Sequence, residues 1–308
     1  MKEYRFYQVD VFTDRPFGGN PLAVFPHAQG LSGKYMQALA REMNLSETTF
    51  VLPPEGSEAD FKVRIFTPEV ELPFAGHPVV GTHWVLGHLG LVELEEPVTS
   101  VKLELGVGVL QGDLNVVEGR VDWVVMTQKR PTFHEILEDV SDLAAGLNIA
   151  PEAITGETGL PVQIVSTGTP QMMVPIRSLA EVQGLDLREM DVSVLSRVCE
   201  SIGTKFILVF STETEWSESA VHARGFGHLV GVPEDPATGS ANGAMGAYLV
   251  RHRVVPVNKP TVEILSEQGL EMGRPSRIKV NVDHVNGQPT QVRVGGQVVL
   301  VAEGVVRF

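Results

Sequence analysis

Short segments with β-strand character alternate with a helical stretch in the first part of the chain. Four segments rich in β-branched and aromatic residues, bounded by glycine and proline, predict strands: Phe6–Phe12, Ala23–Pro26, Phe50–Leu52 and Lys62–Phe66. Between the second and third of these, apolar residues recur at every fourth position, at Tyr35, Leu39 and Met43. This period predicts a helix over Leu31–Asn44, with Ser32 as its N-cap.

The same order of elements recurs in the second half of the chain. The segment QVDVF…NPLAVF is echoed by QIVSTGTPQMMVPI, the helical stretch by DVSVLSRVCESI, SETTFVL by GTKFILV, and RIFTPEVELPFAGHP by RGFGHLVGVPEDPATGS. Three pairs of residues share one offset of 160 positions: Arg64 and Arg224, Phe66 and Phe226, Pro73 and Pro233. Any α+β chain offers series of strands and helices, but that does not explain the shared Arg-x-Phe, the proline, or the glycine before a helix.

We therefore predict an α+β protein of two homologous lobes. The lobes are expected at residues 1–125 and 126–308, with a boundary inside 122–151, and the last strand is able to return to the N-terminal lobe.

Each series ends in a glycine turn followed by an apolar helix. Gly76-His77-Pro78 leads into VVGTHWVLGHLG, which is apolar nearly all round and predicts a buried central helix with Pro78 at its first position. Gly239-Ser240 leads into a helix whose small residues would let strands pack closely. The first turn of such a helix presents free N–H groups, so each turn is suited to a carboxylate or an enolate-like oxygen. We expect the two turns to face each other across a cleft between the lobes.

A purely structural interpretation of these turns stays open. Gly76 and Gly239 would then be tight turns only, and Ser240 only an N-cap. The paired occurrence of the turn, with acidic residues nearby, favours a functional role.

Glu47 is the strongest candidate for acid/base chemistry. It lies between the predicted helix and the next strand, and the matching region of the second half, residues 203–206, has no carboxylate. The halves have therefore diverged here, as expected when one acid/base works from one lobe. The alternative is a solvated loop glutamate, which is the common situation for this residue type.

Three further polar residues flank the glycine turns. Asp235 is either a helix-start acid or a partner of the chemistry, and His77 is either a satisfied turn histidine or a proton carrier. Glu234 matches no role and is expected to be a solvated neighbour.

Composition narrows the class of protein. Apolar residues make up 43% of the 308 residues, and 38 acidic against 24 basic residues give a net charge of −14, which disfavours nucleic acid as a partner. A single cysteine, Cys199, rules out an internal disulfide and a multi-cysteine metal cluster. The N-terminus lacks an apolar signal core and no run approaches the ~20 apolar residues of a membrane span, so a cytoplasmic protein without membrane contact is expected.

Five motifs together resemble the PhzF-like (phenazine biosynthesis) family, which shares the diaminopimelate epimerase fold. They are DVFTDRPFGGNPLAVF (10–25), NLSETTFV (44–51), RIFTPEVELPFAGHPVVGT (64–82), STGTPQMMVPI (166–176) and EDPATGSANG (234–243), and they span nearly the whole chain. The resemblance implies two similar lobes, each a curled, barrel-like sheet around a central helix.

The resemblance also implies a set of site residues. The family's acid/base glutamate falls on Glu47, its histidine on His77, and its aspartate and serine on Asp235 and Ser240. Substrate-binding positions fall on Gly76, Gly239, Asn20 and Thr238. Related epimerases place a cysteine before each glycine; here those positions are Ala75 and Thr238, so a two-thiol racemisation is not available. The resemblance further implies no cofactor or metal, a small carboxylic-acid substrate and a homodimer.

Three function hypotheses follow. The first is a cofactor-independent isomerase that moves a proton within a small carboxylate-bearing metabolite, with Glu47 as base and then acid. The second is an epimerase or racemase acting through carboxylate and histidine chemistry. The third is a non-catalytic metabolite-binding protein of the same fold. The sequence disfavours nucleotide enzymes, zinc hydrolases and serine hydrolases, because the chain has no GxGxxG, P-loop, HExxH or GxSxG motif.

Overall fold

The computed structural model describes residues 2–155 and 159–308 and divides the chain into two compact units. Unit 1 comprises residues 1–127 and 295–308, and unit 2 comprises residues 128–294. No helix in the described part of the chain combines the length and hydropathy required to cross a membrane.

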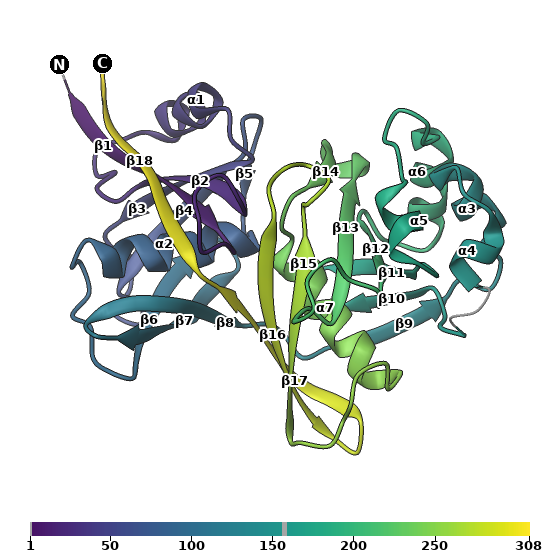
Figure 1. Cartoon of the computed structure of the whole chain (residues 1–308). Coiled ribbons are helices and arrows are strands. Elements are labelled where there is room, and N and C mark those ends of the chain that lie inside the picture. Colours follow the sequence, from purple (N-terminus) through teal and green to yellow (C-terminus); the bar gives the residue numbers. More distant parts are fainter. Residues whose placement is uncertain (1, 156–158) are drawn as a thin grey trace. The chain divides into compact units, whose positions relative to one another are not determined.

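Each unit combines strands with a central helix and outer helices (Figure 1). Unit 1 contains β1 (Glu3–Val11), β2 (Asn20–Phe25), α1 (Gly33–Met43), β3 (Glu47–Leu52), β4 (Phe61–Phe66), β5 (Glu71–Leu72), α2 (Gly76–His88), β6 (Val98–Leu105), β7 (Gly108–Val117), β8 (Arg120–Thr127) and β18 (Val298–Arg307). Unit 2 contains β9 (Thr132–Ile136), α3 (Ser141–Leu147), α4 (Pro151–Thr155), β10 (Gln163–Ser166), β11 (Pro170–Pro175), α5 (Leu179–Gln183), α6 (Val192–Ser201), β12 (Ile207–Ser211), β13 (Val221–Gly227), the 3₁₀ turn His228–Val230, β14 (Val232–Asp235), α7 (Gly239–Arg251), β15 (Thr261–Gln268), β16 (Ser276–Val285) and most of β17 (Gln288–Gly296).

The strand pairings of the two units match one by one and confirm the predicted duplication. In unit 1, β1–β2, β3–β4 and β6–β7 are antiparallel, while β2–β3 and β4–β6 are parallel. In unit 2, β10–β11, β12–β13 and β15–β16 are antiparallel, while β11–β12 and β13–β15 are parallel. A helix lies between the two strands of the first parallel pair in each unit, α1 in one and α6 in the other.

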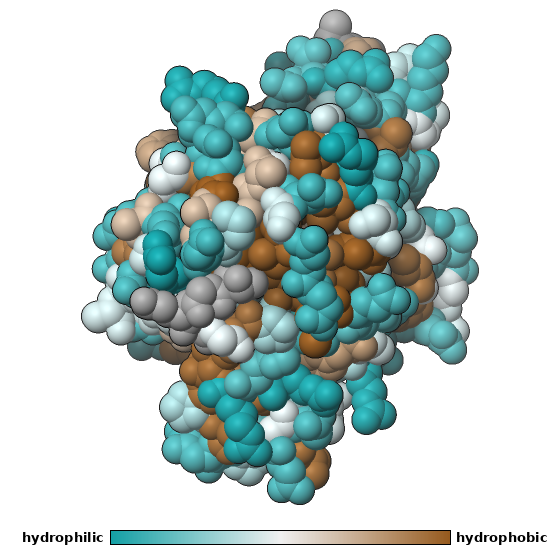
Figure 2. Space-filling view, turned by 90° about the vertical axis from the view of Figure 1, so that its right-hand side faces the viewer, coloured by the Kyte–Doolittle hydropathy of each residue, from teal (hydrophilic) through white to brown (hydrophobic). Residues whose placement is uncertain are grey.

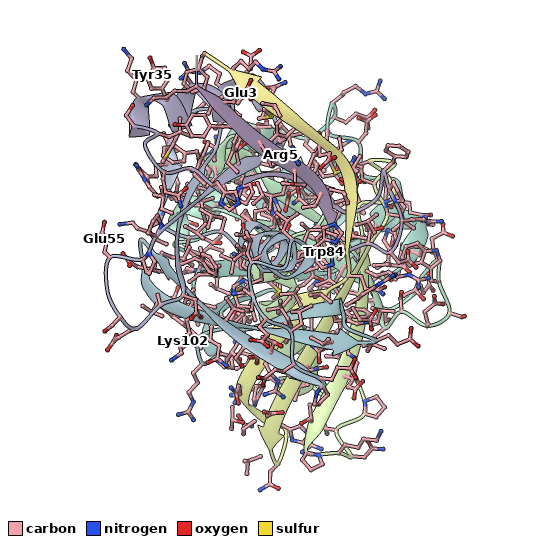
Figure 3. All side chains as sticks on the ribbon, turned by 90° about the vertical axis from the view of Figure 1, so that its left-hand side faces the viewer. Glu3, Arg5, Tyr35, Glu55, Trp84 and Lys102 are labelled. Carbon is pink, nitrogen blue, oxygen red and sulfur yellow. The ribbon has the colours of Figure 1, made fainter. Side chains whose placement is uncertain are left out.

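The central helix of unit 1 is α2, and its glycines let strands pack directly on its backbone. Residues 77–87 are all buried, as the apolar pattern predicted. A Cβ added to Gly81 would lie 2.6 Å from Leu22 Cδ2 and 2.8 Å from Val11 Cγ2, so β1 and β2 touch the helix backbone. Figure 3 shows α2 end-on, carrying Trp84, with the strands of unit 1 around it. The helix therefore serves as the core of its unit.

Helix α7 has the same place in unit 2. Eleven of its thirteen residues are buried. A Cβ on Gly246 would lie 2.5 Å from Val280 Cγ1 on β16, so the prediction that small residues admit close strand packing is confirmed.

A second apolar layer covers the outer face of each sheet. In unit 1 it is formed by α1, whose Ser32 N-cap accepts a hydrogen bond from the Tyr35 N–H as predicted. In unit 2 helices α3 to α6 supply the larger cluster, which contains Leu143, Leu195 and Cys199. Figure 2 looks onto unit 2, where hydrophilic residues form most of the surface and apolar ones show between them.

The repeated Arg-x-Phe motif is one interaction built twice. Arg64 lies over the Phe66 ring and forms a two-pronged pair with Glu71; Arg224 lies over the Phe226 ring and pairs in the same way with Glu234. The expectation that Glu234 is a solvated neighbour is wrong, because its side chain is only 5% exposed and binds Arg224 at 2.8 and 2.9 Å. The sequence did not reveal this, since the two residues lie on different strands.

The duplicated pair gives an internally controlled stability test. Arg224 and Glu234 are 4% and 5% exposed, whereas Arg64 and Glu71 are 28% and 43% exposed. Glu234→Ala leaves a buried guanidinium without its carboxylate and is expected to lower the free energy of unfolding by ~3–5 kcal/mol. Glu71→Ala breaks a solvated pair and is expected to cost ~0–1 kcal/mol. Urea unfolding of both variants checks this, and equal losses would contradict it.

Candidate functional site

Strand β3 and helix α2 bring Glu47 to His77 in unit 1. Side chains alternate along a strand, so Glu47 and Thr49 point to the same face. Thr49 Oγ1 lies 2.9 Å from Thr82 Oγ1 on α2, which identifies this face as the one that packs on the helix. Glu47 Oε2 accordingly lies 3.3 Å from His77 Nε2, with the two side chains 16% and 7% exposed. A nearly buried carboxyl group thus faces the first turn of the central helix.

His77 is neutral at physiological pH, so its contact with Glu47 is not an ion pair. Burial lowers the pKa of His77 to about 3, although a hydrogen bond to the Pro21 backbone opposes this shift. The Pro21 carbonyl can only accept, and Nε2 is the nitrogen that faces Glu47 without a hydrogen bond. We therefore assign the ring proton to Nδ1, which leaves the Nε2 lone pair directed at the carboxyl group.

Helix α2 begins at Gly76 without a side-chain cap. Its N-cap, Ala75, is extended and makes no side-chain hydrogen bond, whereas Asp191 accepts two N–H groups at the start of α6. The first-turn N–H groups of α2 are thus not occupied by a capping side chain, which suits them to an anionic ligand. Pro78 is the third residue of the helix, not the first as expected, because the helix already begins at Gly76.

Asn20 lies beside this pair at the start of β2. It is fully buried and pairs with Val11 across the β1–β2 ladder. The two residues that follow it reach the site: Pro21 binds His77 through its backbone, and Leu22 is the β2 partner of Glu47. Unit 1 therefore brings together Glu47, His77, Gly76 and the strand start at Asn20.

Unit 2 brings together the other four predicted residues. Asp235 ends β14, and Thr238 is the N-cap of α7, which begins at Gly239. The Thr238 hydroxyl donates to Asp235 Oδ2 at 2.5 Å. Ser240 is the second residue of the helix, so its interpretation as N-cap is wrong. That the two sets of residues serve one site stays a prediction.

Two glutamines hold the start of α7, and sequence reasoning missed both. Gln128 Nε2 donates to the Gly239 carbonyl at 3.1 Å, and a Cβ on Gly243 would lie 2.0 Å from Gln128 Oε1. Gln268, at the end of β15, binds Asp235 and Thr238. Both side chains bind residues at least 26 positions away, so no local pattern signals them.

A second buried cluster of titratable groups surrounds His222. Its Nδ1 lies 2.8 Å from Glu267 Oε1 and its Nε2 2.7 Å from Glu271 Oε1. Burial disfavours the charged ring, but hydrogen bonds and the charges of both glutamates outweigh burial and raise its pKa to about 9. Both ring nitrogens are occupied, so His222 links β13 to Glu267 on β15 and to Glu271 in the turn that follows. Among residues 2–155 and 159–308, no group of three His, Cys, Asp or Glu side chains is arranged to hold a metal ion.

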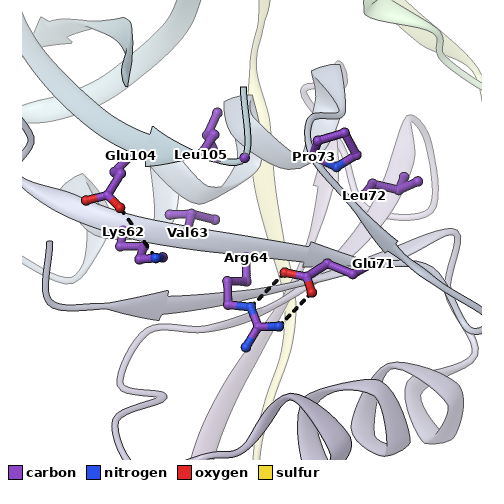
Figure 4. A pocket seen from close by; sticks show the side chains of 9 residues that line it. Lys62, Val63, Arg64, Glu71, Leu72, Pro73, Glu104 and Leu105 are labelled. Atoms are coloured by element: carbon purple, nitrogen blue, oxygen red, sulfur yellow. Dashed lines mark hydrogen bonds and ion pairs between the residues drawn. The ribbon is translucent and has the colours of Figure 1, made fainter. Parts of the chain in front are cut away.

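A cavity of about 380 Å³ in unit 1 lies apart from these residues (Figure 4). Its lining includes Lys62, Arg64, Glu71 and Glu104, and neither Glu47 nor His77 is part of it. Lys62 pairs with Glu104 and Arg64 with Glu71, so the charges compensate one another. We do not assign acid/base chemistry to this cavity.

Cys199 is not available as a nucleophile. It is buried in α6, and burial raises the pKa of its thiol to about 11. The positions where related epimerases are expected to carry cysteine are Ala75 and Thr238, the N-cap residues of α2 and α7.

The two curled sheets, each around a central helix, define a protein of the diaminopimelate epimerase-like fold. The sequence profile of phenazine biosynthesis-like proteins matches residues 9–304, and the chain belongs to this PhzF family.

Several relatives are named as isomerases. The chain is 35% identical over 303 residues to trans-2,3-dihydro-3-hydroxyanthranilate isomerase of Pseudomonas aeruginosa, covering 98% of both proteins. It is 33% identical to an uncharacterized isomerase of Clostridium acetobutylicum, covering 98% of this chain and 97% of the relative. The crystal structure of a PhzF-family protein from Bacillus anthracis superimposes with a TM-score of 0.87, at 30% identity over the whole of both chains. A hydroxyproline epimerase from Agrobacterium vitis, 18% identical with a TM-score of 0.67, shares the fold. The protein is therefore an enzyme of an isomerase family.

The depressed pKa of His77 predicts a pH-dependent contribution to stability. An unfolded histidine titrates near 6.5 and the folded His77 near 3, so the unfolded state binds one more proton between these values. Above pH ~6.5 the burial of neutral His77 does not make the free energy of unfolding depend on pH. Below this value, the free energy of unfolding falls as the pH falls toward 3. His77→Asn should therefore flatten the acid loss of unfolding free energy by up to ~1.4 kcal/mol per pH unit in this window.

Urea unfolding from pH 7 to pH 4 measures this difference. His27→Asn, which alters an exposed histidine, is the matched control and should leave the slope unchanged. A wild-type slope in His77→Asn would show that His77 is not held neutral by burial.

Proposed function

We propose that the protein is a cofactor-independent isomerase that moves a proton within a small carboxylate-bearing metabolite, with Glu47 as the acid/base. The observation that carries the proposal is the 3.3 Å approach of Glu47 Oε2 to the neutral Nε2 of His77, beside the first turn of α2. Membership of an isomerase family supports the reaction class.

In this mechanism Glu47 removes a proton from an acidic C–H bond of the substrate and returns one to a different carbon. The carboxyl group is 16% exposed, so its proton exchanges with solvent between removal and return. The Nε2 lone pair of His77 provides an acceptor for that proton while the substrate rearranges. His77 therefore acts as a neutral hydrogen-bond acceptor that orients the protonated carboxyl group of Glu47, and not as a cation.

The start of α2 supplies the electrostatic part. The electron pair released by the C–H bond moves toward a conjugated oxygen of the substrate, where negative charge develops. The first-turn N–H groups at Gly76, left without a capping side chain by Ala75, are suited to hold this oxygen or the substrate carboxylate. Asn20, Thr238 and Gly239 are proposed as further substrate-binding residues, and Asp235 and Ser240 as groups that orient the substrate.

The substrate class follows from the relatives by analogy. The P. aeruginosa relative is named for an isomerisation of trans-2,3-dihydro-3-hydroxyanthranilate, which carries a carboxylate beside a ring. We propose a small acid with an acidic C–H conjugated to an oxygen-bearing group. Epimerisation remains the competing outcome: the fold is shared with a hydroxyproline epimerase, yet both N-cap positions lack the thiols of a two-cysteine mechanism.

Replacing the base tests the proposal. Turnover of trans-2,3-dihydro-3-hydroxyanthranilate in D₂O, followed by NMR, should incorporate one solvent deuteron per product. Glu47→Gln keeps the size of the side chain and should reduce turnover and deuteron incorporation by about 10²–10⁴-fold. Glu42→Gln, at an exposed position on α1, is the control and should behave as the parent.

Two results would contradict the proposal. Full exchange activity in Glu47→Gln would remove Glu47 as the base. A change in optical rotation without a change in the ultraviolet chromophore, with trans-4-hydroxy-L-proline as the probe, would favour epimerisation instead.

A further inference from the structure

The Gln268 side chain is fully buried at the end of β15 and uses all of its hydrogen-bonding capacity. Its Nε2 donates to the Asp235 carbonyl at 2.7 Å and to Thr238 Oγ1 at 3.2 Å. Its Oε1 accepts from the Thr238 N–H at 3.2 Å and from Asn242 Nδ2 at 2.7 Å. An amide group offers two donors and two acceptor sites, so none remains for another partner.

These contacts fix the orientation of the amide. The reverse orientation would place the NH₂ group against the Thr238 N–H and the Asn242 amide, and the oxygen against the Asp235 carbonyl. In the reverse orientation a donor would face two donors, and an acceptor would face an acceptor. The orientation of Gln268 is therefore determined by its surroundings.

The fixed amide in turn sets the direction of the Thr238 hydroxyl. Because Thr238 Oγ1 accepts from Gln268 Nε2, its own proton is left to donate to Asp235 Oδ2, at 2.5 Å. A short O–H···O contact of this kind is typical of a hydroxyl bound to a carboxylate. One oxygen of Asp235 is thereby engaged and the side chain is held in one orientation.

Strand pairing holds the backbone of Gln268 in place on both sides. Gln268 pairs with Ala223 on β13 and with Ser276 on β16, so its backbone lies between two strands. Ser276 Oγ donates to the Pro236 carbonyl at 2.8 Å, and a Cβ on Gly269 would lie 2.5 Å from the same oxygen. The turn before α7 is thus held against the sheet at its backbone by Ser276 and at its polar side chains by Gln268.

We propose that Gln268 is a positioning residue: through the Thr238 hydroxyl it sets the orientation of the Asp235 carboxylate and of the first turn of α7. The inference rests on the proposed function only for the role of Asp235 toward substrate. The hydrogen-bond chain itself is independent of that role.

Gln268→Glu is the sharpest variant, because it keeps the size and the Oε1 acceptor. The replaced Nε2 becomes an oxygen that faces the Asp235 carbonyl and offers the Thr238 hydroxyl a competing acceptor. Thr238→Val removes the hydroxyl directly. Ser276→Ala is the matched control, since it removes a buried hydroxyl on β16 that binds only backbone carbonyls and contacts neither the Asp235 nor the Thr238 side chain.

With trans-2,3-dihydro-3-hydroxyanthranilate as probe, we expect kcat to fall about 10²-fold in Gln268→Glu and in Thr238→Val, with KM within threefold of the parent in Gln268→Glu. The double variant should lose no more than the worse single variant, because both changes break one chain. Ser276→Ala should keep kcat within threefold. Losses that multiply in the double variant, or an equal loss in Ser276→Ala, would overturn the inference.

A second measurement does not depend on turnover. In protein labelled with ¹³C-aspartate, the Asp235 ¹³Cγ signal should shift in Gln268→Glu and Thr238→Val and stay in place in Ser276→Ala. An unchanged signal in Gln268→Glu would overturn the inference, also if that variant is less stable. If the parent does not convert the probe while the signal shifts as expected, the proposed function fails and the positioning role stands.

Discussion

The burial of α2 and α7 is the constraint on which the rest of the structure depends. A helix surrounded by strands needs apolar residues on all sides and glycine where a strand meets its backbone, as at Gly81 and Gly246. It also begins at a partly buried turn, where the orphan N–H groups of the first turn need a partner. In α2 and α7 no side chain of the N-cap residue satisfies these groups. The packing that stabilises each unit therefore also creates a place suited to an anionic ligand.

The two halves share this framework but differ in polar chemistry. In the sheet register anchored by Arg64 and Arg224, Thr48 pairs with Phe66 and Ile207 with Phe226, so the residue matching Glu47 is the buried Phe206. A carboxyl group in one half thus corresponds to an aromatic ring in the other. At the helix starts, unit 1 places a neutral histidine and unit 2 a carboxylate bound by a threonine hydroxyl. Such divergence suits one-sided acid/base chemistry better than a symmetric exchange of protons.

The sequence was informative where the determinants are local or repeated. The period of Leu31–Asn44, the Ser32 cap and the apolar stretch after Pro78 predicted helices that the structure contains. The shared offset of Arg64 and Arg224 predicted a duplication that the strand pairings confirm. Helix starts were less certain: Ser240 resembles a cap, yet the chain turns at Thr238, where Gln268 and Asn242 bind the backbone. The contacts of Glu234, Gln128 and Gln268 could not be predicted from the sequence, because only the tertiary fold brings these residues to their partners.

The last strand of unit 1 has a consequence for the order of folding during synthesis. Strand β18 pairs along the whole of β1, from Glu3 opposite Arg307 to Val11 opposite Val298, and Phe308 stacks on Tyr4 and Tyr35. Unit 1 is therefore incomplete until residues 298–307 have been made, whereas all of unit 2, residues 128–294, precedes them in the chain. Domains usually complete their folding from the N-terminus onward. In this chain the unit that carries Glu47 and His77 is completed after unit 2. Until then one edge of β1 is unpaired, because its partner strand β18 lies nearly three hundred residues later in the sequence.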